Sequence, residues 1–286
     1  MPPDTLAAIK NIADFGSNDL STYATEYLIR INAVGEQLEF YIRDAICGSF
    51  KLLHREKEVR YRSVFSLLGN QNNPPDMIIR GGDAFEIKKI RSLRTSIALN
   101  SSPPKDRLHR DDPRVTKACR NCEGGNWDTK DLFYIVGCAK NGRIQYLFIV
   151  QGECYAAERE VYDSIASTLK GSLESSFQSE GIEGIGQTVE LGRVNRVDPL
   201  GITNLRIRGM WMIENPVRVF SYIYTLDTSK PFSLAALMTR RKFDSYPQQS
   251  IASLEEDERI NLEAVNVKNP NNPVEQLNSV LITSSW

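Results

Sequence analysis

Hydrophobic residues recur along this chain with spacings that predict both helices and strands. Spacing of three and four residues across 24–47 predicts an amphipathic helix that stops at Gly48. The same spacing predicts a second helix over 157–175. Two β-branched and aromatic runs, near 131–138 and 144–150, flank Asn141-Gly142, a dipeptide typical of a tight turn. This pair is expected to form a β-hairpin.

Beyond the second helix the pattern becomes less regular. Residues 178–200 are glycine-rich and predict irregular structure. Residues 202–226 predict further strands, with a break at 214–216. The last forty residues are rich in asparagine, proline and acidic residues, so we expect mostly loops there.

The segment "PPDMIIRGGDAFEIKKI", residues 74–90, predicts two antiparallel strands, 76–80 and 84–91, around a glycine-rich turn. Because side chains alternate between the two faces of a strand, the length of this turn decides which residues share a face. A two-residue turn would place Asp76 and Glu86 on opposite faces.

A three-residue turn, 81–83, instead pairs Arg80 with Ala84 and Asp76 with Lys88. It places Asp76, Glu86 and Lys88 on one face. The opposite face then collects only apolar side chains, namely Met77, Ile79, Phe85 and Ile87. We favour this arrangement because it separates charged from apolar positions, and because glycine tolerates the left-handed backbone of such a turn. Asp83 is then expected to serve the turn.

These elements together predict an α/β fold with a mixed β-sheet flanked by helices and a partly β C-terminal region. The length of 286 residues allows one large domain. We expect a catalytic core over about 24–175 and a region over about 176–286 that serves specificity or dimerisation.

Composition narrows the class of protein. Hydrophobic residues make up 41% and charged residues 25% of the chain, no apolar run is long enough to span a membrane, and no secretion leader opens the sequence. A cytoplasmic protein is therefore expected. The net charge is −1, yet residues 80–120 hold 11 basic and 5 acidic residues, whereas 244–286 hold 2 and 7. This suits an enzyme that grips a polyanion in one cleft.

The charged face of the predicted hairpin has a definite chemical use. Two carboxylates held close together repel each other unless a cation lies between them. Mg²⁺ binds a few carboxylate oxygens and keeps several waters, which suits phosphodiester hydrolysis. Asp76, Glu86 and the Ile87 carbonyl are the candidate ligands, and Lys88 could balance charge in the transition state.

Other chemistries fit the chain less well. Cys119 and Cys122 form a C-x-x-C pair without a second pair, and we expect Cys138 and Cys154 to be buried free thiols. His54 and His109 are the two histidines, too few for a histidine-centred metal finger. No Ser-His-Asp grouping, Walker loop or GxGxxG motif is found.

Pro75-Asp76 followed by Glu86-Ile87-Lys88 has the spacing used in the PD-(D/E)XK nucleases. The stretches "GNQNNPPDMIIRGGDAFEIKKI", "IALNSSPPKDRL", "ACRNCEGGNWDTKDLFYIVG" and "GECYAAEREVYDSI" resemble the NgoPII-type type II restriction endonucleases. The resemblance spans roughly residues 30–165. It implies that Asp76 and Glu86 bind Mg²⁺, that Lys88 is catalytic, and that the target is a GGCC-type palindrome. It further implies a companion DNA methyltransferase.

Many PD-(D/E)XK enzymes carry a further acidic residue on the helix before the motif. Glu36 and Glu39 both qualify, and we favour Glu39. An ion pair between Glu39 and Arg43 on a solvated helix face explains the same residue equally well.

Candidate DNA contacts follow the hairpin in the sequence. Arg, Lys, Asn and Ser side chains reach phosphates and base edges, and guanine is read by bidentate Arg or Lys. The candidates are Arg91, Arg94, Asn100, Ser101, Ser102, Lys105 and Arg120 and, from a second basic cluster that also holds Arg193 and Arg196, Arg206 and Arg208.

The sequence therefore predicts a Mg²⁺-dependent, sequence-specific endonuclease of double-stranded DNA. A palindromic site cut on both strands calls for a homodimer. Three alternatives stay open: a structure-specific or repair nuclease of the same fold, a catalytically inactive DNA-binding protein, and a zinc-stabilised interaction protein that uses Cys119 and Cys122.

Overall fold

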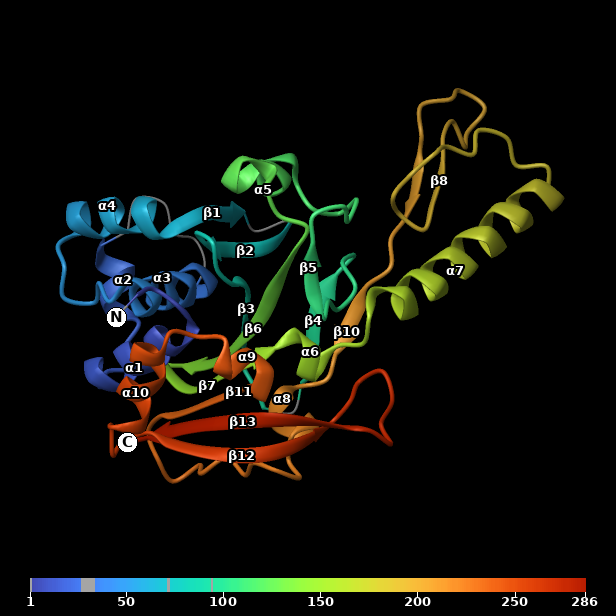
Figure 1. Ribbon diagram of the computed structural model, residues 1–286. Coiled ribbons are helices and arrows are strands. Elements are labelled where there is room, and N and C mark those ends of the chain that lie inside the picture. The colour runs from blue at the N-terminus through green and yellow to red at the C-terminus, as the bar shows by residue number, and fades with distance from the viewer. Residues whose placement is uncertain (1, 27–33, 71–72, 94) are drawn as a thin grey trace.

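A computed structural model describes residues 2–26, 34–70, 73–93 and 95–286 of the protein. In these residues one nine-stranded mixed sheet organises the fold, with the strand order β1-β2-β3-β6-β7-β11-β13-β12 and β5 paired to β6 (Figure 1). Two two-stranded sheets, β4 with β10 and β8 with β9, complete the β-structure. The strands are β1 Phe65–Asn70, β2 Asn73–Ile79, β3 Ala84–Ile90, β4 Ile97–Asn100, β5 Arg107–His109, β6 Thr129–Lys140, β7 Arg143–Gln151, β8 Gly192–Val194, β9 Leu205–Ile207, β10 Trp211–Ile213, β11 Ser233–Thr239, β12 Asn261–Lys268 and β13 Gln276–Ser285.

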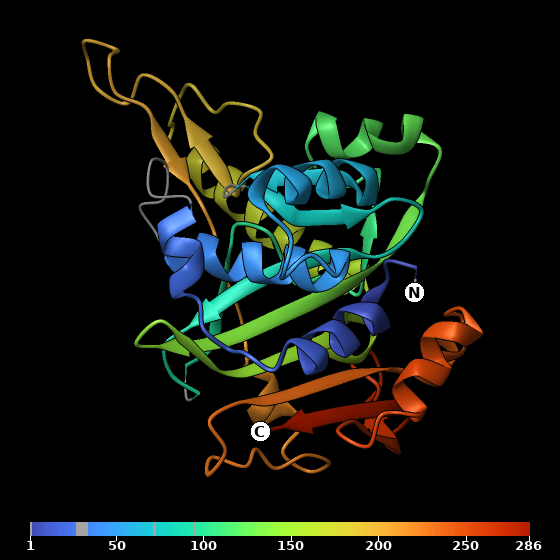
Figure 2. The ribbon, with the colours of Figure 1, turned by 90° about the vertical axis from the view of Figure 1, so that its left-hand side faces the viewer.

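Helices flank both faces of the large sheet (Figure 2). They are α1 Thr5–Phe15, α2 Ser21–Glu26, α3 Val34–Cys47, α4 His54–Val64, α5 Lys117–Asn121, the 3₁₀ turn η1 Cys122–Gly125, α6 Gly152–Tyr155, α7 Arg159–Ser179, α8 Pro216–Val219, α9 Arg240–Asp244 and α10 Gln248–Glu255. The expected α/β class with a mixed sheet is confirmed. No helix in the described residues combines the length and apolar composition that a membrane crossing needs.

Each face of the large sheet covers its own hydrophobic core. The first core gathers side chains of α1, α3, α4 and α10 against one face, with Leu6, Leu38 and Tyr61 fully buried. The second core lies on the other face and includes Leu108, Phe148 and side chains around α8. The sheet is thus buried on both sides, which is why its central strands β6, β7 and β11 read as nearly continuous apolar runs.

The hairpin predicted around Asn141-Gly142 is confirmed. β6 and β7 pair antiparallel up to Lys140 and Arg143, which leaves Asn141 and Gly142 as a two-residue turn. Both turn residues have positive φ, 51° and 74°, as the favoured hairpin turn of this length requires.

Strands at both expected positions of segment 74–90 are also found, but the predicted pairing is wrong. β2 and β3 pair Ile78 with Ala84 and Met77 with Phe85, rather than Arg80 with Ala84. The Ile79 N–H donates to the Asp83 carbonyl, so the turn is made by residues 80–82 instead of 81–83. The register is shifted by two residues, and an even shift leaves every side chain on its predicted face.

The predicted division into faces therefore holds. Met77, Ile79, Phe85 and Ile87 lie together in the first core. The opposite face, which carries the three charged residues, is not open to solvent over its whole length, because Ile78, Ala84 and Ile90 join the second core there.

Of two other expectations, the first is met in part and the second is wrong. The helix expected over 24–47 corresponds to α2 and α3, and its middle, 27–33, lies outside the described residues. Gly48 ends α3 with a φ of 62°, as expected. The expectation of mostly loops at the C-terminus is wrong, because α10, β12 and β13 fill most of the last forty residues. Asparagine and proline gather instead in the turn 269–273 between β12 and β13. The overall composition of this region did not reveal the apolar residues of the two strands.

Residues 159–210, here called the arm, leave the body of the molecule. The arm consists of α7, an irregular segment and the short ribbon β8–β9, and it projects from one side in both views (Figures 1 and 2). The chain returns to the body at β10, which pairs with β4. The expectations of a helix over 157–175 and of irregular structure over 178–200 are confirmed.

Candidate active site

Asp76 on β2 and Glu86 and Lys88 on β3 lie on one face of the sheet, where the β2–β3 ladder ends. Beyond Met77 and Phe85 no further backbone pair joins these strands. The Ile87 N–H donates to Asp76 Oδ2 at 2.6 Å instead. Lys88 Nζ lies 2.6 Å from Glu86 Oε1. Where the backbone pairing of β2 with β3 ends, the Asp76 side chain thus takes the place of a backbone acceptor for the Ile87 N–H.

The electrostatics of this centre favour a cation. Burial raises the pKa of Asp76 to about 8, and the negative charges of Glu86 and Glu39 add to the rise, although the Ile87 hydrogen bond and Lys88 oppose it. Burial by itself would lower the pKa of Lys88, but the Glu86, Asp76 and Glu39 carboxylates raise it above its usual value. Lys88 is therefore a cation at neutral pH.

Glu39 on α3 faces the same centre. Its negative charge contributes to the raised pKa of both Asp76 and Lys88. It also lies 3.4 Å from Arg43, one helical turn further on, and both side chains are largely buried. The two interpretations of Glu39 are thus compatible, but the helix face is not a solvated one. The side chain of Glu36 lies outside the described part of the structure.

Glu86 and Ile87 each present an oxygen atom at the centre. Glu86 Oε2 is buried and has no hydrogen-bond partner among the described residues. The Ile87 carbonyl lies on the same side of β3 as the Ile87 N–H, and hence toward Asp76, because both groups of a strand residue point to the same neighbour. Together with Asp76 these groups form a set of oxygen ligands.

A small cavity of about 10 Å³ adjoins Glu86 and is lined by Ser102, Lys105 and Tyr134, among others. Its volume is close to that of one water molecule. The Ser102 hydroxyl, like Glu86 Oε2, is buried without a partner among the described residues. Tyr134 stands opposite Glu86 in the parallel pairing of β3 with β6. Sequence inspection missed Tyr134, because nothing in the chain indicated which strand would lie beside β3.

A larger cleft of about 540 Å³ opens between the body and the arm. It is lined by Pro74, Ser101 and Ser102 from the body and by Arg208 from the arm. Pro74 and Ser102 also line the cavity beside Glu86, so the two hollows adjoin. The structure thus brings three of the predicted DNA-contact residues to a cleft that leads to the carboxylates.

The other predicted contact residues lie elsewhere or have other partners. Asn100 is exposed at the end of β4, and Arg91 is exposed just after β3. Lys105 is buried against Asp112, so its charge is already neutralised. Arg120 donates to the carbonyls of residues 112 and 113. Arg94 lies outside the described residues.

Both arm arginines of the prediction, Arg206 and Arg208, bind the same carboxylate, that of Glu190. Their side chains are more than half exposed, so this pairing leaves part of each guanidinium open to solvent. Arg193 donates to Asn195 within the same ribbon.

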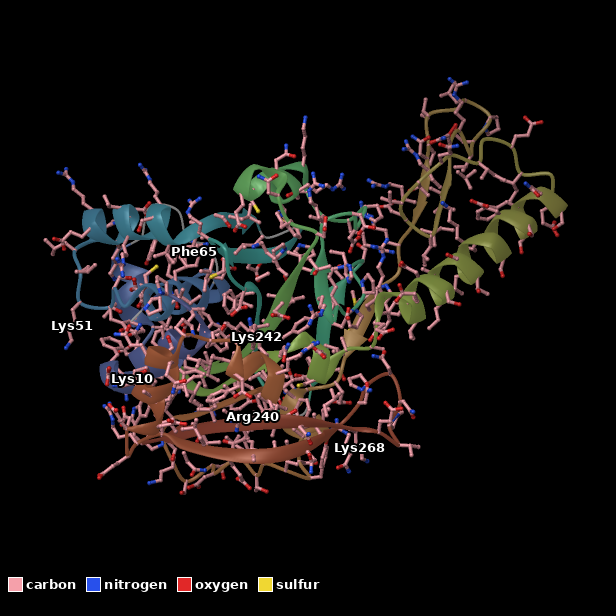
Figure 3. The ribbon with its side chains drawn as sticks, in the orientation of Figure 1. Lys10, Lys51, Phe65, Arg240, Lys242 and Lys268 are labelled. Atoms are coloured by element: carbon pink, nitrogen blue, oxygen red, sulfur yellow. The ribbon has the colours of Figure 1, made fainter. Side chains whose placement is uncertain are left out.

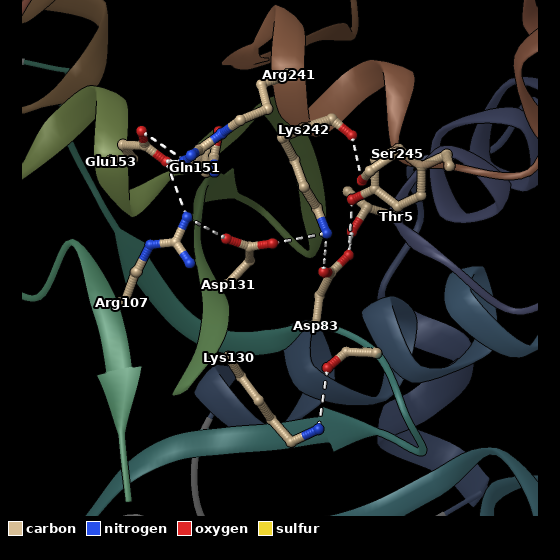
Figure 4. Close-up of polar contacts among 12 residues, drawn as sticks. Thr5, Asp83, Arg107, Lys130, Asp131, Gln151, Glu153, Arg241, Lys242 and Ser245 are labelled. Carbon is tan, nitrogen blue, oxygen red and sulfur yellow. Dashed lines mark hydrogen bonds and ion pairs between the residues drawn. The ribbon is translucent and has the colours of Figure 1, made fainter. Parts of the chain in front are cut away.

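Asp83 does more than complete the turn. Its buried carboxylate accepts from Thr5 on α1 and from Tyr246, and it pairs with Lys242 on α9 at 2.5 Å (Figure 4). Lys242 also lies 3.0 Å from Asp131 on β6. Figure 3 shows Lys242 in the middle of the molecule, unlike Lys51 and Lys268 at its edge. Asp83, the residue directly before β3, is thus held by two distant segments, α1 and residues 242–246.

All five cysteines are buried and none forms a disulfide. Burial raises the pKa of Cys119 to about 12, so without a bound cation this thiol is protonated at neutral pH. In the described residues no group of three or more His, Cys, Asp or Glu side chains is arranged to hold a metal. The carboxylate centre accordingly offers two side chains and a backbone carbonyl rather than a cage of three side chains.

Comparison with known proteins identifies the family of the chain. The sequence pattern of the family described as NgoPII restriction endonuclease matches residues 3–268. The type II restriction enzyme NgoPII of Neisseria gonorrhoeae is 43% identical over 260 residues, which cover 89% of this chain and 90% of that protein. No solved structure matches the chain. A match over nearly the whole chain, at this identity, means that the protein belongs to the NgoPII restriction endonuclease family.

Proposed function

We propose that this protein is a type II restriction enzyme that uses Mg²⁺ to hydrolyse both strands of double-stranded DNA at a short GC-rich palindrome. The observation that carries the proposal is the pair Asp76 and Glu86 beside Lys88. Glu86 lines a small cavity that adjoins the large cleft between body and arm. The family supports DNA cleavage. The PD-(D/E)XK spacing assigns the chemistry to these three residues.

The residues of the centre fit a small divalent cation. Glu86 Oε2 is buried without a partner among the described residues, and the pKa of Asp76 is raised by burial and by neighbouring carboxylates. Both conditions would be relieved by a cation between the two groups. Asp76, Glu86 and the Ile87 carbonyl would hold Mg²⁺, which prefers oxygen ligands. When bound, Mg²⁺ would polarise a phosphoryl oxygen and lower the pKa of the attacking water.

Lys88 acts as a cation in this proposal. Its raised pKa keeps the ammonium charged, so it would stabilise the negative charge that develops on the phosphoryl oxygens rather than accept a proton. The ion pair with Glu86 holds its Nζ at the site before DNA binds. Glu39 adds a third negative charge and would strengthen cation binding.

The finer assignments extend the proposal. We assign a GGCC-type target by resemblance, and a pair of identical subunits because a palindrome cut on both strands presents two equivalent bonds. A companion methyltransferase would protect the same sequence in the host DNA. The cytoplasmic location and the division into a core, 24–175, and a C-terminal specificity or dimerisation region, 176–286, stay predictions.

Substitution of the lysine tests the assignment. Lys88→Met should bind duplex DNA with nearly unchanged affinity but cut it at least ~10³-fold more slowly, because only transition-state charge is lost. Lys89→Met, the neighbouring lysine on the other side of β3, is the control and should cut normally. Mg²⁺-dependent cleavage that survives in Lys88→Met would refute the assignment and favour a different centre.

A further inference from the structure

One face of the short ribbon β8–β9 on the arm is basic. Arg193 on β8 lies directly opposite Arg206 on β9, and Arg208 follows two residues later. Ile207, between the two arginines, points to the other face, where it lies near Leu173 of α7. Like charges that stand opposite each other destabilise a pair of strands. A basic face of this kind therefore indicates an anionic or electron-rich partner.

Two of these arginines are held by one carboxylate. Arg206 donates to Glu190 through Nε and Nη2, at 2.9 and 2.8 Å, and Arg208 donates through Nε at 2.6 Å. These hydrogen bonds hold the pKa of Glu190 below its ordinary value, so the carboxylate is ionised at neutral pH. The Glu190 side chain is 11% exposed, whereas those of Arg206 and Arg208 are 57% and 55% exposed. The carboxylate is thus nearly buried, and the two guanidinium groups remain open to solvent.

The contacts with Glu190 leave the outer edge of both guanidinium groups available. Arg208 uses Nε, and Arg206 uses Nε with one of the two Nη2 hydrogens. The edge formed by Nη1 and Nη2 therefore points away from Glu190 in each group. This edge donates two parallel hydrogen bonds, which match O6 and N7 of guanine in the major groove. Both arginines share one acceptor, Oε1 of Glu190, which keeps their guanidinium groups side by side.

The position of this pair also suits a DNA duplex. A two-stranded ribbon fits the major groove of B-DNA. The ribbon stands on the projecting part of the molecule (Figure 1), and Glu190 and Arg208 line the cleft between arm and body. On the body side, Pro74 and Ser102 line both this cleft and the cavity beside Glu86. A duplex bound in the cleft would lie against the ribbon on one side and near the carboxylate centre on the other.

We propose that Glu190 is a positioning residue for sequence recognition, which holds Arg206 and Arg208 in place to read two adjacent guanines through O6 and N7. The inference rests on the proposed cleavage at a GC-rich palindrome, because that target supplies the guanines. Arginines that are held before DNA binds lose their conformational freedom on folding rather than on binding. They also cannot turn to a phosphate instead, so a wrong base leaves their donors unpaired.

Binding of short duplexes that carry 7-deazaguanine tests the proposal, because this base pairs normally with cytosine but lacks the N7 acceptor. The full-length protein is titrated with a GGCC duplex and with the same duplex substituted at every guanine of the site. Ca²⁺, which also binds carboxylate oxygens, replaces Mg²⁺ to limit cleavage. The wild type should bind the substituted duplex at least ~10-fold more weakly.

Glu190→Gln should reduce this ratio of affinities to about twofold, because a neutral amide holds the two guanidinium groups less firmly. Its affinity for a third duplex, which lacks the site, should not fall, since the change removes a negative charge from the cleft. Glu183→Gln is the matched control. It removes the same charge from an exposed position on the same arm and should keep the wild-type ratio.

Four outcomes would overturn the proposal. They are a wild type that binds the first two duplexes equally, a Glu190→Gln variant that keeps the full ratio, an equal loss of affinity for all three duplexes, and an equal gain for all three. The equal loss would mean that Glu190 only supports the fold, and the equal gain that it only competes with DNA. Cleavage of the unsubstituted duplex with Mg²⁺ is scored separately. A protein that cuts it without these ratios contradicts the inference alone, and one that shows the ratios without cutting contradicts the proposed function alone.

Discussion

At the scale of single residues, the carboxyl group of Asp76 dominates the centre. Its pKa of about 8 in the folded protein exceeds the ordinary value of 3.8. Protonation therefore favours the folded state: the contribution is complete below pH 3.8 and is lost as the pH rises to about 8. Without a cation, the ionised Asp76 should destabilise the protein at neutral and alkaline pH.

Asp76→Asn tests this sign. In a chelator at pH 8 the variant should be more stable than the wild type by roughly 2 kcal/mol or more, and the difference should shrink toward pH 4. Adding Mg²⁺ should raise the stability of the wild type more than that of the variant. Urea unfolding across this pH range gives both quantities. An equal dependence on pH in the two proteins would mean that Asp76 is not buried as an ionised group.

The grouping of Asp76, Glu86 and Lys88 on one face could be predicted from the sequence because spacing and alternation act locally. Partners that come from other strands could not. Tyr134 faces Glu86 only because β3 lies parallel to β6, and Lys105 is withdrawn from the surface by Asp112. Such pairings depend on tertiary contacts that no single-sequence pattern encodes.

At the scale of elements, Gly69 on β1 allows this strand to lie close to the backbone that carries Asp76. A Cβ atom at this position would lie 2.3 Å from the Pro75 carbonyl oxygen and 3.2 Å from the Asp76 Cα. Both are backbone atoms, so the strand that carries Asp76 would have to move. No local pattern indicates that this glycine faces Asp76, because the approach of β1 to β2 is a tertiary contact.

Gly69→Ala should therefore reduce cleavage strongly. A displacement of Asp76 by about 1 Å would lower the cleavage rate on the order of a hundredfold. Gly171→Ala is the control, because a Cβ there meets no atom within 4 Å and the helix should gain stability. Single-turnover cleavage rates give the comparison, and equal rates in both variants would show that β2 adapts without moving the carboxylate.

The second feature at this scale is Asp83, at the end of the β2–β3 turn, and its buried contacts. The turn was predicted from its glycines and from the separation of charged and apolar positions, and its register was wrong by two residues. The Asp83 carboxylate, expected to serve the turn, is held by Lys242, Thr5 and Tyr246. Local turn chemistry could not reveal partners that lie near both ends of the chain.

Lys242→Met should destabilise the fold by about 3 kcal/mol, because it leaves Asp83 as a buried charge without its cation. Arg240→Ala removes the ion pair of Arg240 with Asp244 on the same helix, which is about half exposed, and should cost less than ~1 kcal/mol. Urea denaturation measures both changes. Losses of similar size would mean that the buried pair contributes no more than a surface pair.

At the scale of the whole molecule, the fold class and the central hairpin were predictable because the apolar runs are long and their periods are clear. The projection of the arm away from the body and the C-terminal strands were not. The exposed stripe of α7 has the same spacing as a core-facing stripe, so the sequence alone does not distinguish a helix that packs on its own sheet from one that projects. β12 and β13 complete the sheet next to β11 although their surroundings resemble loops in composition.

The most direct test of the central claim is digestion of a mapped DNA with the purified protein and Mg²⁺, followed by sequencing of both ends of every fragment. We expect discrete fragments whose ends fall at one short GC-rich palindrome on both strands and carry 5′-phosphates. No fragments should form in a chelator. Ends scattered over unrelated sequences, nicks confined to branched DNA, or tight binding without any cleavage would contradict the claim.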